Sequence, residues 1–313
     1  MTTTTPRRVS VIIGTRDRPE LLREALTSIR ALEGPDLTFE ILVGDNGSAA
    51  ETPDVVAQFG GIYAKTDKNG CAAARNLAMR RATGDFIAFL DDDDLWMPGH
   101  IRPHIAFLEA HPDYEAVFSQ IVSTNTQRQP LGEPWPSSLP PDGDVFGMML
   151  SGYFPQVGGS VFRGNAIAKY GLMDESLIGD SDWDWQLRIA RNGKIGLIEA
   201  PCVLFRQRDP GSFDQLQRTR QKFLSRQAPF ERLTARKIYR AYIGAVWQYF
   251  DYFCAYAVQR SIAGEYAGAR SALFGAFLTL PHVAISRFLR VPELRAAVWS
   301  SALGSRPVSV ENR

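Results

Sequence analysis

Residues 9–18 of the 313-residue chain are Val-Ser-Val-Ile-Ile-Gly-Thr-Arg-Asp-Arg, and a helical pattern follows this stretch. Its first six residues form a short apolar, β-rich run, which predicts a buried strand. After the polar turn, apolar residues recur at helical spacing: Leu21, Leu22, Ala25, Leu26 and Ile29. This spacing predicts an amphipathic helix, so the stretch opens a strand–loop–helix unit.

The same alternation continues outward from this unit. Strands are predicted at 39–43, 61–64 and 86–90, and helices near 54–59 and over 72–82. Repeated β–α alternation predicts an α/β fold with a mostly parallel sheet flanked by helices. Ligands of such sheets bind beyond the carboxyl ends of the strands, so the residues there are the first candidates for chemistry.

Three polar clusters follow predicted strands directly and are expected at one edge of the sheet. They are Thr15 to Arg18, Asp45 to Ser48 and Asp91 to Asp94. Four consecutive carboxylates repel one another, and a divalent cation would remove that penalty. Magnesium and manganese favour carboxylate oxygens and are often shared with substrate phosphates, so this Asp-x-Asp arrangement suits a metal-bridged nucleotide diphosphate. The alternative is a solvated turn that caps the helix predicted from Pro98.

Composition narrows the class of protein further. The chain has 35 basic and 34 acidic residues, a formal charge of +1, which does not indicate a nucleic-acid partner. Residues 1–8 are polar and are expected to be disordered, without the apolar stretch of a secretory signal. Three cysteines without paired or metal-type spacing, expected to be buried, indicate a reducing location, and we expect a cytoplasmic protein.

Five motifs, in this order, resemble the family-2 glycosyltransferases of the GT-A fold. They are residues 9–18, Val43-Gly-Asp-Asn-Gly-Ser48, Asn69-Gly-Cys-Ala-Ala-Ala-Arg-Asn76, Phe89-Leu-Asp-Asp-Asp-Asp-Leu-Trp96 and Asp182-Trp-Asp-Trp-Gln-Leu-Arg188. The resemblance extends over about 9–208 and implies transfer of a sugar from a nucleotide diphosphate donor, most commonly a UDP-sugar, to an acceptor hydroxyl with inversion. A glycan or a lipid-linked acceptor of the cell envelope is the expected recipient.

The resemblance also implies a domain organisation. Residues 9–212 would form the GT-A catalytic domain, with a nucleotide-sugar-binding half at 9–95 and an acceptor-binding half at 96–212. Residues 213–313 would form a helical C-terminal extension.

The resemblance assigns roles at the nucleoside and the metal. Thr15, Arg18 and Asp45 would hold the nucleoside, and Asp91 would lie near the ribose. Asp93 would bind the manganese or magnesium ion. Carboxylates suit these roles because they accept hydrogen bonds from sugar hydroxyls and base N–H groups.

Further residues are expected at the diphosphate. Asn69 and Asp92 belong to the donor-binding set, although the Asp92 side chain is expected to face away from its neighbours. Arg75 would contact phosphate or Asp93, unless it is a surface or core-paired arginine. Arg208 stands where the family often has a histidine; arginine cannot ligate a cation but can neutralise diphosphate.

Asp182 is the candidate general base, because an inverting transfer needs one carboxylate to accept the proton of the acceptor hydroxyl. The family's usual glutamate before this base is Ser181 here. Asp180 and Asp184 are rival bases, and Asp182 could instead cap a helix over 182–192. Trp183 could stack on the acceptor sugar or simply pack in the core.

The C-terminal region carries an aromatic-dense stretch at 239–256. It could pack on the catalytic domain, attach peripherally to a membrane surface at the inner face of the cell membrane, or form a homodimer. His100 and His104 have a spacing that zinc sites use, but no third ligand accompanies them, and we expect them on a solvated helix face.

Two alternatives to a glycosyltransferase stay open. A sugar-nucleotide-forming nucleotidyltransferase would need a longer Gly-rich turn and a lysine after the first strand, where this chain has Arg16-Asp-Arg-Pro19. A catalytically silent carbohydrate-binding protein on the same fold is the second alternative.

Overall fold

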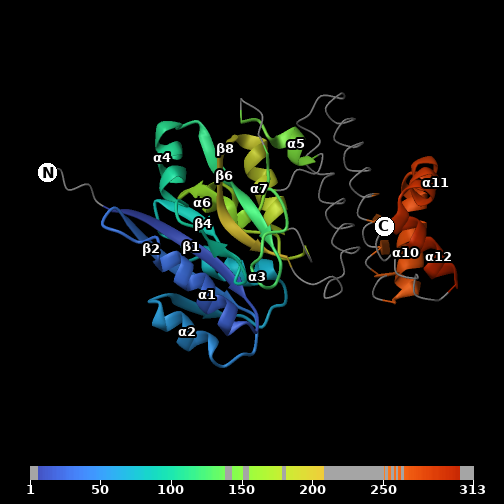
Figure 1. The fold of residues 1–313 in the computed structure, drawn as a ribbon. Helices are drawn as coiled ribbons and strands as arrows, with labels where there is room; N and C mark the ends of the chain where they lie inside the picture. The colour runs from blue at the N-terminus through green and yellow to red at the C-terminus, as the bar shows by residue number, and fades with distance from the viewer. Residues whose placement is uncertain are drawn as a thin grey trace. The chain divides into compact units, whose positions relative to one another are not determined.

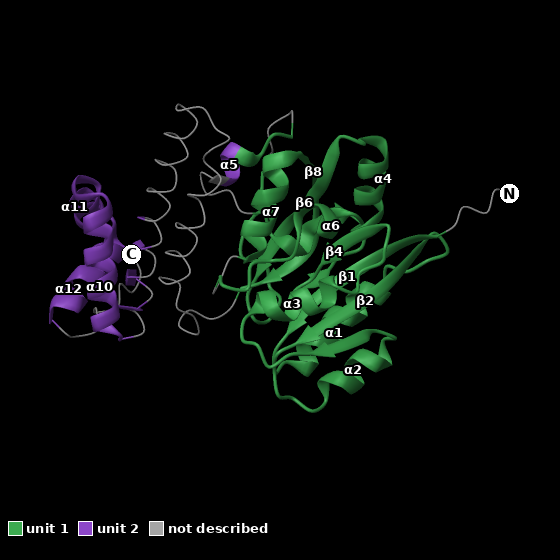
Figure 2. Cartoon of the chain, turned by 180° about the vertical axis from the view of Figure 1, so that it is seen from behind, with its two compact units in different colours: residues 1–146, 154–208 green, residues 147–153, 209–313 purple. Residues whose placement is uncertain are grey.

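The computed structural model describes residues 6–137, 143–150, 155–177, 181–207, 250, 253–254, 257–258, 260–261 and 264–303. The chain divides into two compact units, which Figure 2 colours separately. The first contains residues 1–146 and 154–208, and the second contains residues 147–153 and 209–313. The predicted boundary at 212–213 between catalytic domain and extension stays a prediction.

The first unit alternates strands and helices along its N-terminal half (Figure 1). Its strands are β1 (Arg7–Thr15), β2 (Leu37–Asp45), β3 (Ile62–Lys65), β4 (Phe86–Phe89), β5 (Leu95–Trp96), β6 (Tyr114–Thr124), β7 (Ser160–Arg163) and β8 (Lys194–Arg206). Its helices are α1 (Pro19–Arg30), α2 (Thr52–Gln58), α3 (Cys71–Met79), α4 (Arg102–Ala110), α6 (Ala166–Tyr170) and α7 (Ser181–Asn192). Helix α5 (Phe146–Leu150) spans the point where the two units meet in the sequence, and a 3-10 turn occupies Val157–Gly159.

The strands form one sheet in the order β3-β2-β1-β4-β7-β6-β8-β5. Strands β3, β2, β1 and β4 are parallel neighbours, and β6 pairs with β8 in parallel. Strands β5 and β7 run opposite to the rest. The prediction of an α/β fold with a mostly parallel sheet is therefore confirmed.

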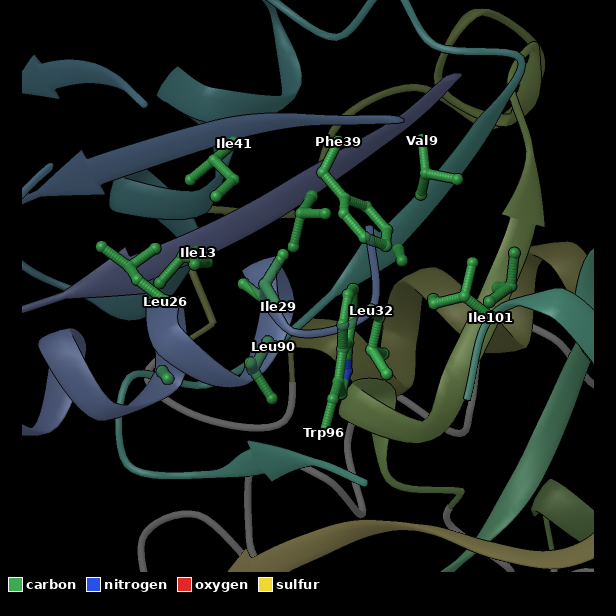
Figure 3. Packing of buried hydrophobic residues seen from close by; sticks show 14 of the residues in the cluster. Val9, Ile13, Leu26, Ile29, Leu32, Phe39, Ile41, Leu90, Trp96 and Ile101 are labelled. Carbon is green, nitrogen blue, oxygen red and sulfur yellow. The ribbon is translucent and has the colours of Figure 1, made fainter. Parts of the chain in front are cut away.

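Alternation of side chains along β1 and β2 divides the core into two layers. Odd-numbered residues such as Val11 and Ile41 pack against the buried stripe of α1, and Figure 3 shows Leu26 and Ile29 of that helix facing the sheet. Each fully buried Leu or Ile side chain contributes about 1.5–3 kcal/mol of transfer free energy. Side chains i and i+2 of a strand share a face, so this sequence pattern fixes which face α1 covers.

The opposite face of the sheet is covered by α3 and α7. Trp185 of α7 packs edge-on against Phe89 and Phe162, with ring centroids 5.4 and 4.9 Å away. Helix α3 approaches β2 at Gly44, where an added Cβ would lie 1.8 Å from the carbonyl oxygen of Ala74. A glycine is thus required for this close approach, which brings α3 to the ends of β1 and β2.

The second half of the sheet differs from the sequence prediction. Residues 194–206, predicted as two short strands, form the single strand β8. Its register against β6 shifts near Ser119 and Gln120, where β-bulges interrupt the pairing, so the strand carries no single alternating pattern. The helix predicted from Pro98 begins at Arg102.

Besides residues 147–150 of α5, the second unit contains the described helices α10 (Tyr266–Thr279), α11 (Pro281–Arg290) and α12 (Pro292–Leu303). Their shared core includes Phe250, Phe253, Leu273 and Leu294. In the described part of the chain, no helix is long and apolar enough to cross a membrane. The predicted aromatic stretch at 239–256 lies mostly outside the described residues.

Candidate functional site

The polar residues predicted at one edge of the sheet do meet there. Thr15 ends β1 and is in register with Asp45, which ends β2. Strand β4 is the other neighbour of β1, with Ile12 opposite Phe89, and the acidic run begins two residues beyond that pair. Parallel pairing therefore brings the ends of three strands together, as the sequence predicts.

Arg18 and Thr15 hold the acidic run from the side of β1. The Thr15 hydroxyl donates to Asp92 Oδ2 at 2.8 Å, and Arg18 Nη1 donates to Asp92 Oδ1 at 3.2 Å and Asp93 Oδ2 at 3.1 Å. The expectation that Asp92 faces away from its neighbours is wrong, because Arg18 bridges Asp92 and Asp93. Burial, together with repulsion from Asp93, raises the pKa of Asp92 to about 6.

Arg75 connects the acidic run to the candidate base. It is 4% exposed on α3; its Nη2 donates to Asp91, and its Nη1 lies 3.5 Å from Asp182 Oδ2. In this structure Arg75 is thus a buried arginine paired with Asp91 and Asp182, and its contact with phosphate stays a prediction. Burial alone would lower the pKa of Arg75, but the charges around it, with Asp91 first and Asp182 also contributing, together outweigh burial and raise the pKa.

The three carboxylates considered as bases differ in their surroundings. Asp182 lies in the first turn of α7, and its Oδ1 accepts from the Trp183 backbone N–H at 3.0 Å. Asp184 points to Arg188, with 3.2 Å between Arg188 Nε and Asp184 Oδ2, and burial raises its pKa. Asp180 lies outside the described residues. Of the two candidates that the structure describes, Asp182 is thus the one that contacts Arg75.

Trp183 is completely buried, so in this structure its side chain packs in the core and is not exposed for stacking on an acceptor sugar. Trp185 is also buried, as predicted. Asn69 is exposed on the loop before α3, and Arg208 lies outside the described residues.

Asp45 is fully buried, and both of its oxygens accept hydrogen bonds from the protein. Oδ1 accepts from the Gly47 N–H at 2.7 Å, and Oδ2 accepts from the Tyr63 hydroxyl at 2.9 Å. Burial, reinforced by the Asp45 carboxylate, raises the pKa of Tyr63 to about 12. A nucleoside contact by Asp45 stays a prediction, and it requires the carboxylate to use a remaining lone pair.

Several residues that shape this edge were missed by sequence reasoning. Asp17, with a φ of 54°, joins the first two turns: its Oδ1 accepts from the Ser48 hydroxyl at 3.0 Å and the Ala49 N–H at 2.9 Å. Arg206 donates its backbone N–H to Asp94 Oδ1 at 2.7 Å. Arg128 Nη1 donates to the Asp93 carbonyl oxygen at 2.5 Å. These contacts join residues far apart in the sequence, and no local pattern marks them.

His100 and His104 are buried, with exposures of 1% and 0%, so the prediction of a solvated helix face is wrong. Their rings pack edge-on, 4.5 Å between centroids, and His100 also packs on Trp96. Burial lowers the pKa of His104 to about 3 and that of His100 well below its ordinary value. The helix begins only at Arg102, so the helical spacing assumed for the two histidines does not extend to His100.

The three cysteines were predicted to be buried. Cys202 and Cys254 are buried, but Cys71 is exposed, so the prediction is wrong for Cys71.

The charges at this edge suit a cation shared with a diphosphate. Arg18 and Arg75 contact the carboxylates of Asp91, Asp92, Asp93 and Asp182, so two guanidinium groups face four carboxylates. The charge of Arg128 is paired with that of Glu24. Among the residues that the structure describes, buried Asp94 Oδ2 has no hydrogen-bond partner. Within the described residues there is no preformed group of three possible metal ligands. Magnesium commonly binds through one or two carboxylates plus phosphates, and the oxygen donors here fit that arrangement.

Comparisons with known proteins agree with this geometry. A sequence model described as Glycosyl transferase family 2 matches residues 10–163. An uncharacterised glycosyltransferase of Methanocaldococcus jannaschii is 28% identical over 227 residues, which cover 69% of this chain and 76% of that protein.

Solved structures resemble the chain over most of its length. Staphylococcus aureus TarS 1–349 in complex with UDP-GlcNAc has a TM-score of 0.60 at 16% identity, covering 95% of this chain and 92% of that one. The mannosyltransferase PcManGT of Pyrobaculum calidifontis, in complex with GDP-Man and Mn²⁺, has a TM-score of 0.51 at 19% identity, covering 96% and 87%. These likenesses confirm the predicted GT-A fold.

Proposed function

The chain belongs to glycosyltransferase family 2, and we propose that it transfers a sugar from a UDP-sugar to an acceptor hydroxyl with inversion, using Asp182 as general base and a divalent cation. The predicted enzyme class is thereby confirmed. Donor identity, inversion and metal dependence are the proposed part. TarS, whose structure contains UDP-GlcNAc, supports the choice of a UDP-sugar as the first donor to test.

The observation that supports this most strongly is the Arg75 bridge. One buried guanidinium contacts Asp91, at the edge where the nucleotide is expected, and lies 3.5 Å from Asp182. A base that accepts a proton from the acceptor must lie close to the donor's anomeric carbon. The bridge fixes the Asp182 carboxylate beside the donor-side carboxylate, which suits that requirement.

The proposed chemistry is a single displacement. The acceptor oxygen forms a bond to the anomeric carbon while the bond from that carbon to the diphosphate oxygen breaks. The hydroxyl proton passes to Asp182, and the electron pair of the broken bond stays on the diphosphate. Arg18 and Arg75 lie where they can orient the acidic run around that leaving group.

Asp93, with Asp91 beside it, is the proposed holder of manganese or magnesium. When bound, the cation would neutralise the charge that develops on the departing diphosphate. The mannosyltransferase with Mn²⁺ supports testing manganese first.

The base assignment is tested with Asp182→Asn, whose amide keeps the shape but accepts no proton. We expect UDP binding within about threefold of wild type and a loss of turnover of about 10²–10⁴-fold. Turnover is measured as the slow hydrolysis of the UDP-sugar, in which water takes the place of the acceptor. NMR of the released sugar identifies which anomer forms first. Asp184→Asn, on the same helix, is the matched control and should retain activity. Equal turnover in wild type and Asp182→Asn would refute the assignment, and retention of the donor's anomeric configuration would refute inversion.

We also propose an anionic membrane surface as the partner of the second unit, in line with a lipid-linked or cell-envelope acceptor. Exposed apolar residues recur at helical spacing: Phe274, Phe277 and Leu278 on α10, and Ile285 and Leu289 on α11. Residues 264–303 carry four arginines and two glutamates, and Arg287 and Arg290 lie in the last turn of α11. Apolar side chains flanked by arginines are typical of helices that lie in the lipid headgroup region.

A further inference from the structure

Arg128 reaches from the loop after β6 to the acidic run. Its Nη1 donates to the carbonyl oxygen of Asp93 at 2.5 Å, and its Nη2 donates to Glu24 Oε2 of α1 at 3.0 Å. One side chain therefore joins the β6 loop, α1 and the turn that carries Asp93. The Arg128 side chain is 19% exposed, whereas that of Glu24 is 54% exposed.

The backbone of Arg128 is held in a conformation that arginine rarely adopts. Its φ is 63°, in the left-handed region, which favours glycine. The turn is fixed by Asn125, whose Oδ1 accepts from the Gln127 N–H at 2.9 Å and the Gln129 N–H at 3.0 Å. The Arg128 N–H donates to the Asn125 carbonyl oxygen at 3.1 Å. A strained residue held this firmly is a candidate for a role of its side chain.

The contact that Arg128 makes differs from those of the other two arginines. Arg18 and Arg75 bind carboxylate oxygens of the acidic run, while Arg128 binds a main-chain carbonyl. It therefore fixes the Asp93 peptide without occupying the carboxylate oxygens that a cation would use. On the other side of the turn, the Arg206 N–H holds Asp94 Oδ1 at 2.7 Å, so the turn is anchored at both flanks.

We propose that Arg128 is a positioning residue for Asp93: it holds the Asp93 peptide so that the carboxylate is presented to the cation and the diphosphate. This inference rests on the proposed function. It assigns a role in donor binding to a loop of the second half of the sheet, which no sequence motif marks.

The test uses Arg128→Gly in the full chain, because glycine relieves the left-handed strain and isolates the side chain's role. We expect the manganese-dependent affinity for UDP, measured by calorimetry, to fall about tenfold or more, as when the outer contacts of a metal ligand are removed. The weaker affinity for UDP that is measured with chelator in place of manganese should be the same in the variant and in wild type. The Tm of the variant should stay close to that of wild type. Arg128→Lys, which keeps one charge but loses the forked geometry, should recover part of the affinity.

Glu24→Gln is the matched control. It removes the ion pair with Arg128 but leaves the contact with the Asp93 carbonyl, so UDP affinity should stay within about twofold of wild type. Unchanged manganese-dependent affinity in Arg128→Gly would overturn the inference while leaving the proposed function intact. An equal loss with and without manganese would also overturn it. Absence of manganese-dependent UDP binding in the wild type would overturn both.

Discussion

At the scale of single residues, the site depends on three arginines that divide the contacts of the acidic run. Arg18 binds the side chains of Asp92 and Asp93, Arg75 binds Asp91, and Arg128 binds the Asp93 peptide. The run itself follows β4 directly, so a single local motif supplies the carboxylates. Their counter-charges come from three separate segments, and only the fold brings them together.

The buried histidine pair makes a prediction about acid stability. In the folded state the pKa of His104 is lowered to about 3, against an ordinary value of 6.5, so the unfolded chain binds more protons as the pH falls below 6.5. The contribution of His104 to the free energy of unfolding is therefore fully present above pH 6.5 and is lost progressively as the pH falls from 6.5 towards 3. Between pH 7 and pH 5 this residue should cost about 2 kcal/mol of unfolding free energy.

His104→Phe keeps a ring in the core and removes this titration. Urea unfolding at pH 7 and pH 5 should show a smaller loss of stability for the variant than for wild type, by about 2 kcal/mol. His111, which is exposed, is the matched control position. Between pH 7 and pH 5, His111→Phe should lose as much unfolding free energy as wild type. An identical pH dependence in wild type and His104→Phe would contradict the account.

Which site residues could be predicted depends on how local their signals are. Thr15 and Asp45 end their strands, and Arg18 and Asp91 come soon after a strand end, so their place at one edge follows from parallel pairing. The Arg75 contact with Asp182 could not be predicted, because it depends on how closely α3 packs on β2. Arg128 carried no signal, since its contact joins residues 35 positions apart.

At the scale of elements, the packing of α3 on β2 sets the position of Arg75. Gly44 permits this contact because a Cβ there would meet the Ala74 carbonyl oxygen at 1.8 Å. The strands and helices of residues 7–89 were predictable because each carries its own periodicity. Strand β8 was predicted only in part, as two short strands, because bulges interrupt its pairing with β6 and break its alternation. Strands β6 and β7 were not predicted.

Gly44→Ala should therefore push α3 away from β2. We expect a loss of about 1–3 kcal/mol of unfolding free energy, as for other forced insertions into a packed core. UDP affinity should fall as well, since α3 carries Arg75. Thermal unfolding and calorimetry measure the two effects.

Gly147→Ala is the matched control for that substitution. Position 147 lies in α5, and among the described residues an added Cβ there meets no atom within 4 Å. Its stability should stay equal or rise by up to about 1 kcal/mol, because alanine favours helix over glycine. A Gly44→Ala variant as stable as this control would show that the close approach is not needed.

At the scale of the whole molecule, the chain combines a GT-A unit with a second, helical unit whose surface carries exposed apolar residues. Leu278, Leu289 and Trp299 have exposures of 63%, 66% and 63%. Exposed apolar surface of this kind marks contact with a membrane or another protein, and it fits the proposed membrane partner of the second unit. The proposed membrane contact would bring a lipid-linked acceptor within reach of the enzyme.

Sedimentation with phospholipid vesicles tests this partner. The wild type should bind vesicles that contain phosphatidylglycerol and dissociate as salt is raised, while neutral phosphatidylcholine vesicles should bind it weakly. Leu278→Glu combined with Leu289→Glu should weaken binding at least tenfold. Binding that is insensitive to both substitutions would refute the role of these helices, and concentration-dependent self-association of the wild type would favour the homodimer instead.

The central claim, that the sheet edge binds a nucleotide diphosphate through a cation on Asp93, is tested most directly by calorimetry with uridine, guanosine and thymidine diphosphates. Each is titrated with manganese and then with chelator, into the wild type and Asp93→Ala. The account predicts manganese-dependent binding of one nucleotide, UDP, which Asp93→Ala loses. Binding of none of the three, with or without manganese, would contradict the account and favour a catalytically silent protein on the same fold.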